Sequence, residues 1–342
     1  MRRSFVLLLF LAASASAQPV ITSITPNTGK VAGGSVVTIN GSGFTTCIIC
    51  SPPAPPNVLF AGTTARSVTL VDSTTLRVVT PPLLPGAFDV TVDQFGGRKT
   101  NPEAYTVSGD PSDGFESVLL PVYSKPVFGA FGSEFHTLAT VSNKMDQQQV
   151  NVYGADSSCT AVIPAPVSPL SPMILNPDGQ TVILPVNCSN WPARLFYVPK
   201  DQAQQVTFND RVLDVTRTQS SNGTEIPIVR SAGMTSGRIV LLNVPIDGRY
   251  RNTLRIYALR PTVAFVTTVG EPHAVVVQPG SNIFEPAYAQ FSDFPVPVDP
   301  GSRSTIRVVI EQPQDIIAGP PMWAFITVTN NETQQITTIT PD

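Results

Sequence analysis

Short apolar runs that alternate with polar residues and stop at Gly, Pro or Asn fill the region from Pro19 to Val107. Val36 to Ile39 follow a Gly-Gly pair, and Val58 to Phe60 end shortly before Gly62. Alternation at every second residue is typical of strands with one buried face, and the residues between the runs are typical of tight turns. After the first twenty positions, no convincing run of apolar residues at helical spacing occurs. The pattern therefore predicts an all-β chain.

The length and composition of the chain fit several β-domains. With 342 residues the chain is too long for one small sandwich, and 34 Pro and 23 Gly interrupt it often. Charged residues make up only 13%, while the apolar share of 42% is enough for several cores. We predict a domain at residues 18–108, a linker at 109–114 and two further β-sandwich units at 115–201 and 202–342.

The first seventeen residues have the features of a secretory signal peptide. Two arginines precede an apolar run from Phe5 to Ala13, and Ala15-Ser16-Ala17 fits a cleavage site before Gln18. A membrane anchor is the alternative, but the run is too short to span a bilayer. We therefore predict a secreted protein, extracellular or periplasmic, without a membrane span. The net charge of −3 predicts no nucleic-acid partner.

The four cysteines suit an exported chain, in which disulfides form readily. Cys47 and Cys50 are three residues apart, so a local bridge is sterically possible across one turn. Cys159 and Cys188 would close a long Pro-rich loop. Three pairings are possible, and we prefer the sequence-local one. A zinc site is the weaker alternative, because a second closely spaced ligand pair is missing.

The N-terminal region also resembles a known family. The motifs are Ile24-Thr25-Pro26-Asn27-Thr28-Gly29, the Gly33-Gly34 pair, Ile39 to Phe44, Val58 to Gly62, and Pro85 to Val92. Together they are similar to the IPT/TIG domains, over about a quarter of the chain. The resemblance implies an early-set immunoglobulin-like sandwich, with Phe44 and Phe60 in its core. The rest broadly resembles β-sandwich repeats of bacterial secreted surface proteins.

The glycines of these motifs have a physical interpretation as well. Gly33-Gly34 suits a tight turn between two strands. Gly41 and Gly43 permit positive φ where one strand ends. Between Thr45 and Asn57 the chain departs from a minimal domain of the family, because it carries two cysteines and a run of prolines. A stapled, stiff loop of this kind is a candidate contact surface, formed by Ile48, Ile49, Pro52 and Pro53. The alternative is a braced insertion without a partner.

No group of side chains has the spacing of a catalytic or metal site. Glu134 and His136 share one face of a predicted strand, but a third ligand or a nucleophile is not visible. Five carboxylates of the last unit could converge as a hydrolase site, although solvated loops and ion pairs are the alternative: Glu225, Asp247, Glu271, Glu285 and Asp293. We therefore predict no enzyme and no cofactor.

Arginines crowd the first half of the last unit, and they favour either an anion- or polysaccharide-binding face or exposed strand faces paired with acids. Arg249 and Arg251 are the candidates for a binding surface, whereas Asp210, Asp214, Glu225 and Asp247 are the expected acid partners. Aromatic platforms for sugars could come from Tyr123, Tyr250 or Tyr288, whereas packing is the alternative. Trp191 is expected to pack on the Cys159–Cys188 bridge, and Trp323 is expected in the core.

These observations favour a secreted or cell-surface, non-enzymatic binding or adhesion protein with an unknown protein or polysaccharide ligand. A carbohydrate-binding accessory protein is the second hypothesis, because domains of the resembled family accompany enzymes that act on polysaccharides. A hydrolase that uses carboxylates of the last unit is the third. Some intracellular relatives of the first domain bind DNA, but the predicted leader and the acidic balance argue against that function here.

Overall fold

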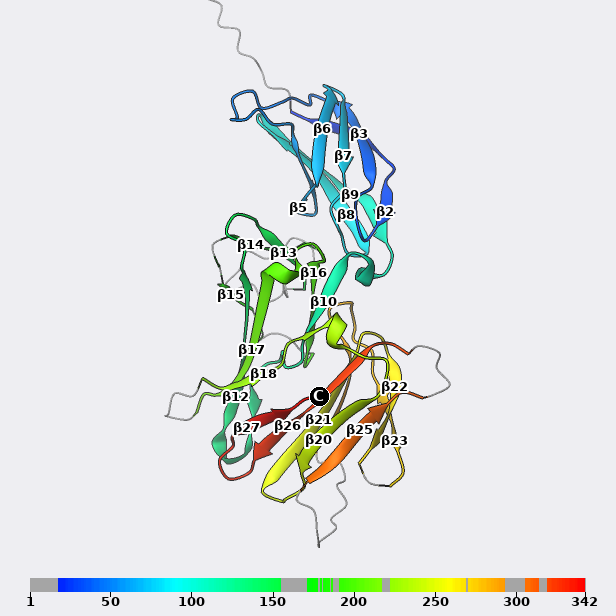
Figure 1. Ribbon diagram of the computed structural model, residues 1–342. Coiled ribbons are helices and arrows are strands. Elements are labelled where there is room, and N and C mark those ends of the chain that lie inside the picture. Colours follow the sequence, from blue (N-terminus) through cyan, green and yellow to red (C-terminus); the bar gives the residue numbers. More distant parts are fainter. Residues whose placement is uncertain are drawn as a thin grey trace, which may run out of the picture. The chain divides into compact units, whose positions relative to one another are not determined.

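The computed structural model in Figure 1 describes residues 18–154, 171–177, 179, 181–184, 186, 191–216, 222–268, 270–292, 305–313 and 319–341. Within these ranges the regular structure is almost entirely β-strand, with four single-turn 3-10 helices. The chain divides into two compact units, one ending at Asp110 and the other beginning at Pro111. The all-β prediction is confirmed, whereas the predicted signal peptide and the Cys159–Cys188 pair lie outside the described residues.

The first unit is a sandwich of two sheets. One sheet has the order β1-β3-β7-β6, formed by β1 (Val20–Thr25), β3 (Val36–Ser42), β7 (Thr75–Val79) and β6 (Ser67–Asp72). The other has the order β2-β9-β8-β4-β5, formed by β2 (Thr28–Lys30), β9 (Gly97–Ser108), β8 (Gly86–Gln94), β4 (Asn57–Phe60) and β5 (Thr63–Thr64). Phe44 and Phe60 are buried as predicted, and Phe60 packs edge-on against Tyr105. Alternate residues of each strand fill this core because side chains of a strand point to opposite faces.

Two glycines explain why the strands of the first unit can turn and approach closely. Gly33 has a φ of +67°, and a Cβ there would lie 2.3 Å from the Pro81 carbonyl oxygen. The predicted tight turn is therefore present between β2 and β3. Gly43 uses the positive φ that the sequence permits, whereas Gly41 does not. A Cβ at Gly41 would lie 1.8 Å from the Val20 carbonyl oxygen and 2.7 Å from Phe44 Cζ, so close packing requires this glycine.

Gly41→Ala is expected to lower the stability of the first unit by about 1–3 kcal/mol, the usual cost of overpacking. For a domain of this size, about 4–8 °C of melting temperature is lost per kcal/mol. Scanning calorimetry of the full chain measures the change. Gly62→Ala is the control, because a Cβ there meets nothing within 4 Å and adds only backbone strain. Equal shifts for both variants would contradict the packing explanation.

The second unit begins with a sandwich around one core. One sheet has the order β16-β10-β19, formed by β16 (Arg194–Pro199), β10 (Phe115–Leu120) and β19 (Val229–Arg230). The facing sheet has the order β11-β12-β17-β18, formed by β11 (Val127–Phe128), β12 (Glu134–Asn143), β17 (Val206–Asp214) and β18 (Thr224–Ile226). β15 (Thr181–Ile183) also pairs with β12, and β13 (Val150–Val152) pairs with β14 (Met173–Leu175). Buried side chains from both sheets, among them Val118, Ala139 and Phe196, form one cluster.

The predicted division between residues 201 and 202 does not follow these sheets. β17 pairs with β12 from end to end, and β19 pairs with β10. The backbone groups of β12 and β10 thus find partners beyond Asp201, so this sandwich continues to about residue 230.

A further sandwich with a separate core completes the second unit. Its core lies between two sheets, which have the orders β20-β25-β22-β23 and β24-β21-β26-β27. The first contains β20 (Ile239–Pro245), β25 (Thr305–Glu311), β22 (Thr262–Thr267) and β23 (His273–Val277). The second contains β24 (Ala287–Ser292), β21 (Tyr250–Ala258), β26 (Met322–Asn330) and β27 (Ile336–Ile339). The predicted final hairpin, with its turn at Asn330-Asn331, corresponds to β26 and β27.

The two sandwiches of the second unit meet on the outer face of the β24-β21-β26-β27 sheet. Tyr257 is buried there, and its ring stacks with Trp323 and Phe325. Its hydroxyl donates to the Pro121 carbonyl of the preceding sandwich. Trp191 donates through Nε1 to the Pro286 carbonyl at 3.0 Å. These contacts hold two separately formed cores in one compact unit.

Candidate functional site

A cleft of about 400 Å³ opens where the two sandwiches of the second unit meet. We call it the inter-sandwich cleft. One wall comes from the sandwich that contains β11, β12 and β17, and the other wall is the outer face of β21 and β26. Its size is within the usual range of small-molecule sites.

The first wall is largely apolar. Thr137 of β12 and Val212 of β17 are directly paired, and both lie on the face that carries the core residues farther along these strands. Phe135 precedes them, and the β11 hairpin adds Phe128, whose side chain is 79% exposed. On β11, Val127 pairs with Phe135 and shares its face, whereas Phe128 pairs with Glu134, so the Phe128 ring stays in water at the edge of the cleft. An exposed ring at this edge is available for contact with a ligand.

The second wall is polar because strand alternation places every second residue of β21 on it. These residues are Arg251, Thr253 and Arg255, and the neighbouring β26 adds Thr327 and Thr329. Arg255 Nη1 donates to Thr327 Oγ1 at 2.7 Å, and the guanidinium carbon lies 5.7 Å from the centre of the Phe325 ring. Arg251 Nη2 makes a longer contact of 3.4 Å to Gln334 Oε1.

Hydroxyl groups are spread over the cleft. Six serine and threonine side chains line it: Ser124, Thr137, Thr253, Ser292, Thr327 and Thr329. A hydroxyl can donate one hydrogen bond and accept two. The described lining therefore offers both donors and acceptors, together with two positive charges and no carboxylate.

Asp210 lies deeper on the same strand face as Val212, and its side chain is completely buried. Burial raises the pKa of this carboxyl well above its usual value, while the amide groups of Val122 and Arg211 lower it by less. These two amides are close enough to act on the charge but do not reach hydrogen-bond geometry, and among the described residues neither carboxylate oxygen has another partner. The expectation that Asp210 pairs with an arginine on an exposed strand is therefore wrong, since the residue faces the core.

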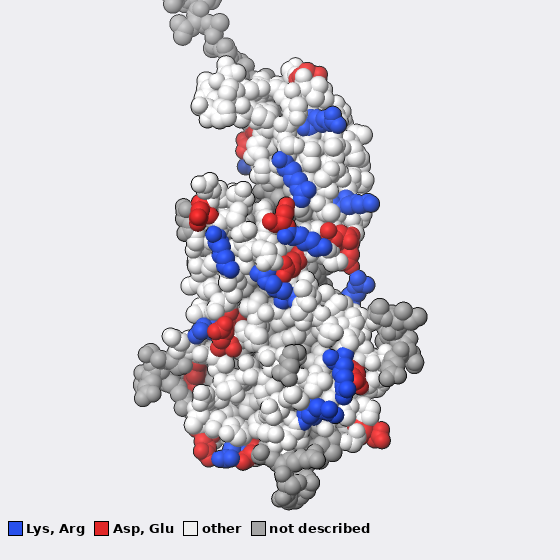
Figure 2. Space-filling model, in the orientation of Figure 1, with Lys and Arg blue, Asp and Glu red and all other residues white. Residues whose placement is uncertain are grey.

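Two of the expected acids, Asp247 and Glu225, pair with arginines, and two further arginines pair with acids that the sequence did not indicate. Arg249 Nη2 lies 2.7 Å from Asp247 Oδ2, and Arg211 lies 3.3 Å from Glu225. Arg230 and Arg238 pair with Glu116 and Glu311. On the face drawn in Figure 2, basic and acidic residues are interspersed, and uncharged surface dominates. Of the two arginines that the sequence proposed for binding, Arg251 lines the cleft and Arg249 does not.

The tyrosines that the sequence proposed as sugar platforms are mostly packed against other side chains. Tyr123 is buried in the core beside Phe196, and Tyr288 packs against Tyr257 and Trp191. Trp323 is buried, as expected, while the predicted bridge partner of Trp191 lies outside the described residues. Phe128 was missed. The signal was present: a phenylalanine directly before the Gly-rich stretch Gly129 to Gly132, where a short turn leaves little room for burial.

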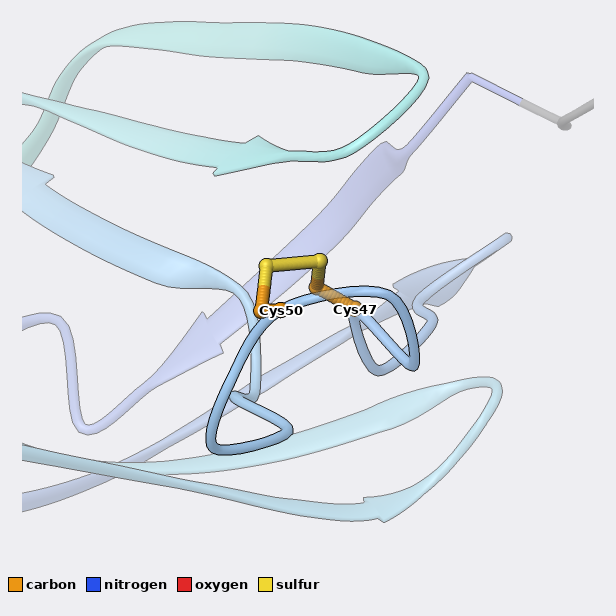
Figure 3. Close-up of a disulfide and its surroundings, with 2 residues drawn as sticks. All are labelled: Cys47 and Cys50. Atoms are coloured by element: carbon orange, nitrogen blue, oxygen red, sulfur yellow. A yellow bond between two sulfur atoms is a disulfide. The ribbon is translucent and has the colours of Figure 1, made fainter.

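The predicted Cys47–Cys50 bridge is present in the first unit, where its two Cα atoms lie 5.4 Å apart (Figure 3). Cys47 and Ala54 exchange backbone hydrogen bonds across the loop. Ile48 and Ile49 at the tip are 82% and 71% exposed, and Pro52 and Pro53 are exposed as well. The role of these four residues as a contact surface stays a prediction.

Glu134 and His136 form the predicted pair, but no third ligand joins it among the described residues. Glu134 Oε1 and His136 Nε2 lie 2.8 Å apart on β12, and both side chains are about one-third exposed. In the described ranges, no group of three His, Cys, Asp or Glu side chains is arranged to hold a metal ion. Of the five candidate carboxylates, Glu225 and Asp247 pair with arginines, and Glu285 accepts from the Ser281 hydroxyl. Glu271 is exposed, and Asp293 lies outside the described residues. No helix among the described residues is long and apolar enough to cross a bilayer.

Solved structures are only distantly similar to this chain. A gamma-CGTase from Alkalophilic bacillus clarkii shares 20% identity, with a TM-score of 0.23 over 63% of this chain and 26% of that one. A Bacteroides ovatus SGBP-B of a mixed-linkage glucan utilization locus, in complex with a heptasaccharide, shares 15% identity, with a TM-score of 0.20 over 56% and 53%. A surface glycan-binding protein from Prevotella bryantii shares 10% identity, with a TM-score of 0.22 over 95% and 99%.

Likeness at this level says nothing about the ligand of this chain, which spans only 26% and 53% of the first two of these proteins. No curated protein is significantly similar in sequence. The N-terminal resemblance is confirmed, because residues 19–107 match the IPT/TIG domain family. The immunoglobulin-like sandwich and the motifs around Gly33-Gly34 and Phe44 agree with that match. Residues 19–107 of this chain are therefore an IPT/TIG domain.

Proposed function

We propose that the protein is an exported, non-enzymatic binding protein that holds a saccharide in the inter-sandwich cleft. The observation that carries this proposal is the combination of Phe128, six hydroxyl side chains and two arginines around one cleft. A sugar ring has apolar C–H faces and a rim of hydroxyl groups. An exposed aromatic ring suits the faces, and the hydroxyl and guanidinium groups suit the rim.

Two features favour binding over catalysis. Glycoside hydrolysis uses two facing carboxyl groups, and the described residues that line the cleft include none. Each wall of the cleft also belongs to a sandwich with its own buried core. The walls are therefore preformed for a ligand. The predicted signal peptide supports a location outside the cytoplasm, where polysaccharides occur.

Replacement of Phe128 tests the proposal. The mature chain from Gln18 is screened for binding to a panel of neutral and acidic polysaccharides by affinity electrophoresis and calorimetry. Phe128→Ala is expected to weaken binding by about tenfold or more, the effect of removing a central aromatic contact. Because the side chain is 79% exposed, the substitution should leave the melting temperature almost unchanged.

Phe131→Ala is the matched control. This phenylalanine lies three residues further on, is 83% exposed and does not line the cleft. It should keep its affinity within about twofold if the ring position, rather than general loop hydrophobicity, determines binding. Binding to no member of the panel, or equal losses in the two variants, would overturn the proposal.

A further inference from the structure

Arg251 and Arg255 differ from four other arginines of the second unit that are paired with acids. Arg211, Arg230, Arg238 and Arg249 each lie within 4 Å of a carboxylate, so their charges are compensated. Within the described residues, Arg251 and Arg255 contact only uncharged groups, and both are half-buried. Their charges are therefore concentrated in the cleft, where a partly enclosed site is screened less than open surface.

Both side chains keep hydrogen-bond donors for a ligand. A guanidinium carries five N–H donors in a planar fork. Arg255 donates to Thr327, also lies near the Tyr288 hydroxyl and is held over the Phe325 ring, so its position is set before binding. The 3.4 Å contact of Arg251 with Gln334 is long for a hydrogen bond and easily exchanged. Carboxylates and sulfates match this fork in geometry and charge.

The spacing of the two arginines indicates an extended ligand. They are four residues apart on β21, with Thr253 between them on the same face. At about 3.3 Å per residue, their Cα atoms are separated by about 13 Å along the strand. The two guanidiniums therefore address separate points of a ligand rather than one shared anion.

We infer, building on the proposed function, that the saccharide is an anionic chain whose carboxylate or sulfate groups are bound by Arg251 and Arg255. Phe128 and the hydroxyl side chains would then contact the sugar rings between these charges. The cleft should therefore prefer this ligand to neutral glucans, because a neutral glucan would leave both guanidiniums without a counter-charge in a partly enclosed site.

Substitution of the arginines tests this inference on the mature chain. Dissociation constants are measured for a polyuronate (alginate or polygalacturonate), a sulfated glycan (chondroitin sulfate) and a neutral β-glucan. Arg251→Gln is expected to weaken binding of the acidic glycan by about 10- to 100-fold, because it removes a charge-assisted hydrogen bond. The salt dependence of binding should fall as well.

Two further variants keep the test interpretable. Arg255→Lys retains the charge but loses the fork, and its melting temperature reveals whether the Phe325 packing has been disturbed. Arg249→Gln is the matched control, because this neighbouring arginine is paired with Asp247 and does not line the cleft. Its affinity should remain within about twofold of the unaltered chain.

Each outcome separates the inference from the function on which it rests. Preference for the polyuronate or for the sulfated glycan supports the inference and identifies the anion. Equal binding of neutral and acidic glycans, lost in Phe128→Ala but kept in Arg251→Gln, would overturn the anionic ligand and leave saccharide binding intact. Binding of none of the three glycans would overturn both.

Discussion

Asp210→Asn is expected to stabilise the second unit at neutral pH, by an amount that grows as the pH rises. Asp210 is completely buried, and within the described residues its oxygens have no partner at hydrogen-bond geometry. Burial raises its pKa well above the usual value in the folded chain. The asparagine amide has almost the same shape as the carboxyl but neither binds a proton nor carries a charge. The substitution therefore removes the cost of protonating the carboxyl, or of burying its charge, when the chain folds.

The sign follows from proton binding. In the unfolded chain Asp210 loses its proton near its ordinary pKa of 3.8, whereas the folded chain keeps it to a higher pH. Between these two pKa values the unfolded state binds fewer protons, so the free energy of unfolding falls as the pH rises. The slope for one proton is at most about 1.4 kcal/mol per pH unit. The cost is absent below the unfolded pKa and constant above the folded one.

Tryptophan fluorescence measures this effect without interference from the first unit. The chain has two tryptophans, Trp191 and Trp323, and both belong to the second unit. Guanidinium unfolding at several pH values from 4 to 8 then yields the difference between Asp210→Asn and the unaltered chain. That difference cancels the contribution of other titrating groups.

Asp247→Asn is the control with the opposite sign. The hydrogen bond from the Arg249 side chain lowers the pKa of Asp247, so its contribution is present above 3.8 and is lost as the pH falls. Any destabilisation in this exposed variant should therefore appear at neutral pH and vanish in acid. If Asp210→Asn followed the unaltered chain in parallel across the pH range, the buried carboxyl would have an ordinary pKa.

Tyr257→Ala is expected to cost about 3–5 kcal/mol, the usual range for deletion of a large buried aromatic side chain. The ring stacks with Trp323 and Phe325, and the hydroxyl donates to the Pro121 carbonyl of the other sandwich. The substitution thus removes packing and a hydrogen bond at the contact between the two cores. Guanidinium unfolding followed by tryptophan fluorescence measures the loss.

Tyr257→Phe separates the two contributions. It keeps the ring, and leaves the Pro121 carbonyl without this donor, at an expected cost of about 1–3 kcal/mol. Because Arg255 lies over Phe325, next to the deleted ring, Tyr257→Ala should also weaken glycan binding, whereas Tyr257→Phe should keep it. Equal costs for both variants would show that the ring packing contributes little.

Local sequence patterns were enough to predict the strands, the IPT/TIG domain and the Cys47–Cys50 bridge. Alternation at every second residue is a property of the strand itself, and a bridge across one turn needs only neighbouring residues. The boundary at residues 201 and 202 was less well predicted, because β17 pairs with β12 across many intervening residues. Strand pairing of this kind is determined by which edges meet in space.

The sequence by itself determined that this is a chain of β-sandwiches and that Arg251 is a candidate for binding. Only the tertiary structure brought Arg251, Arg255 and Phe128 to one cleft, and only it buried Asp210. Residues on β11, β12, β17, β21 and β26 form the cleft, and they are far apart along the chain. Alternation shows which residues share a face, but the packing of one sandwich on another decides what that face meets.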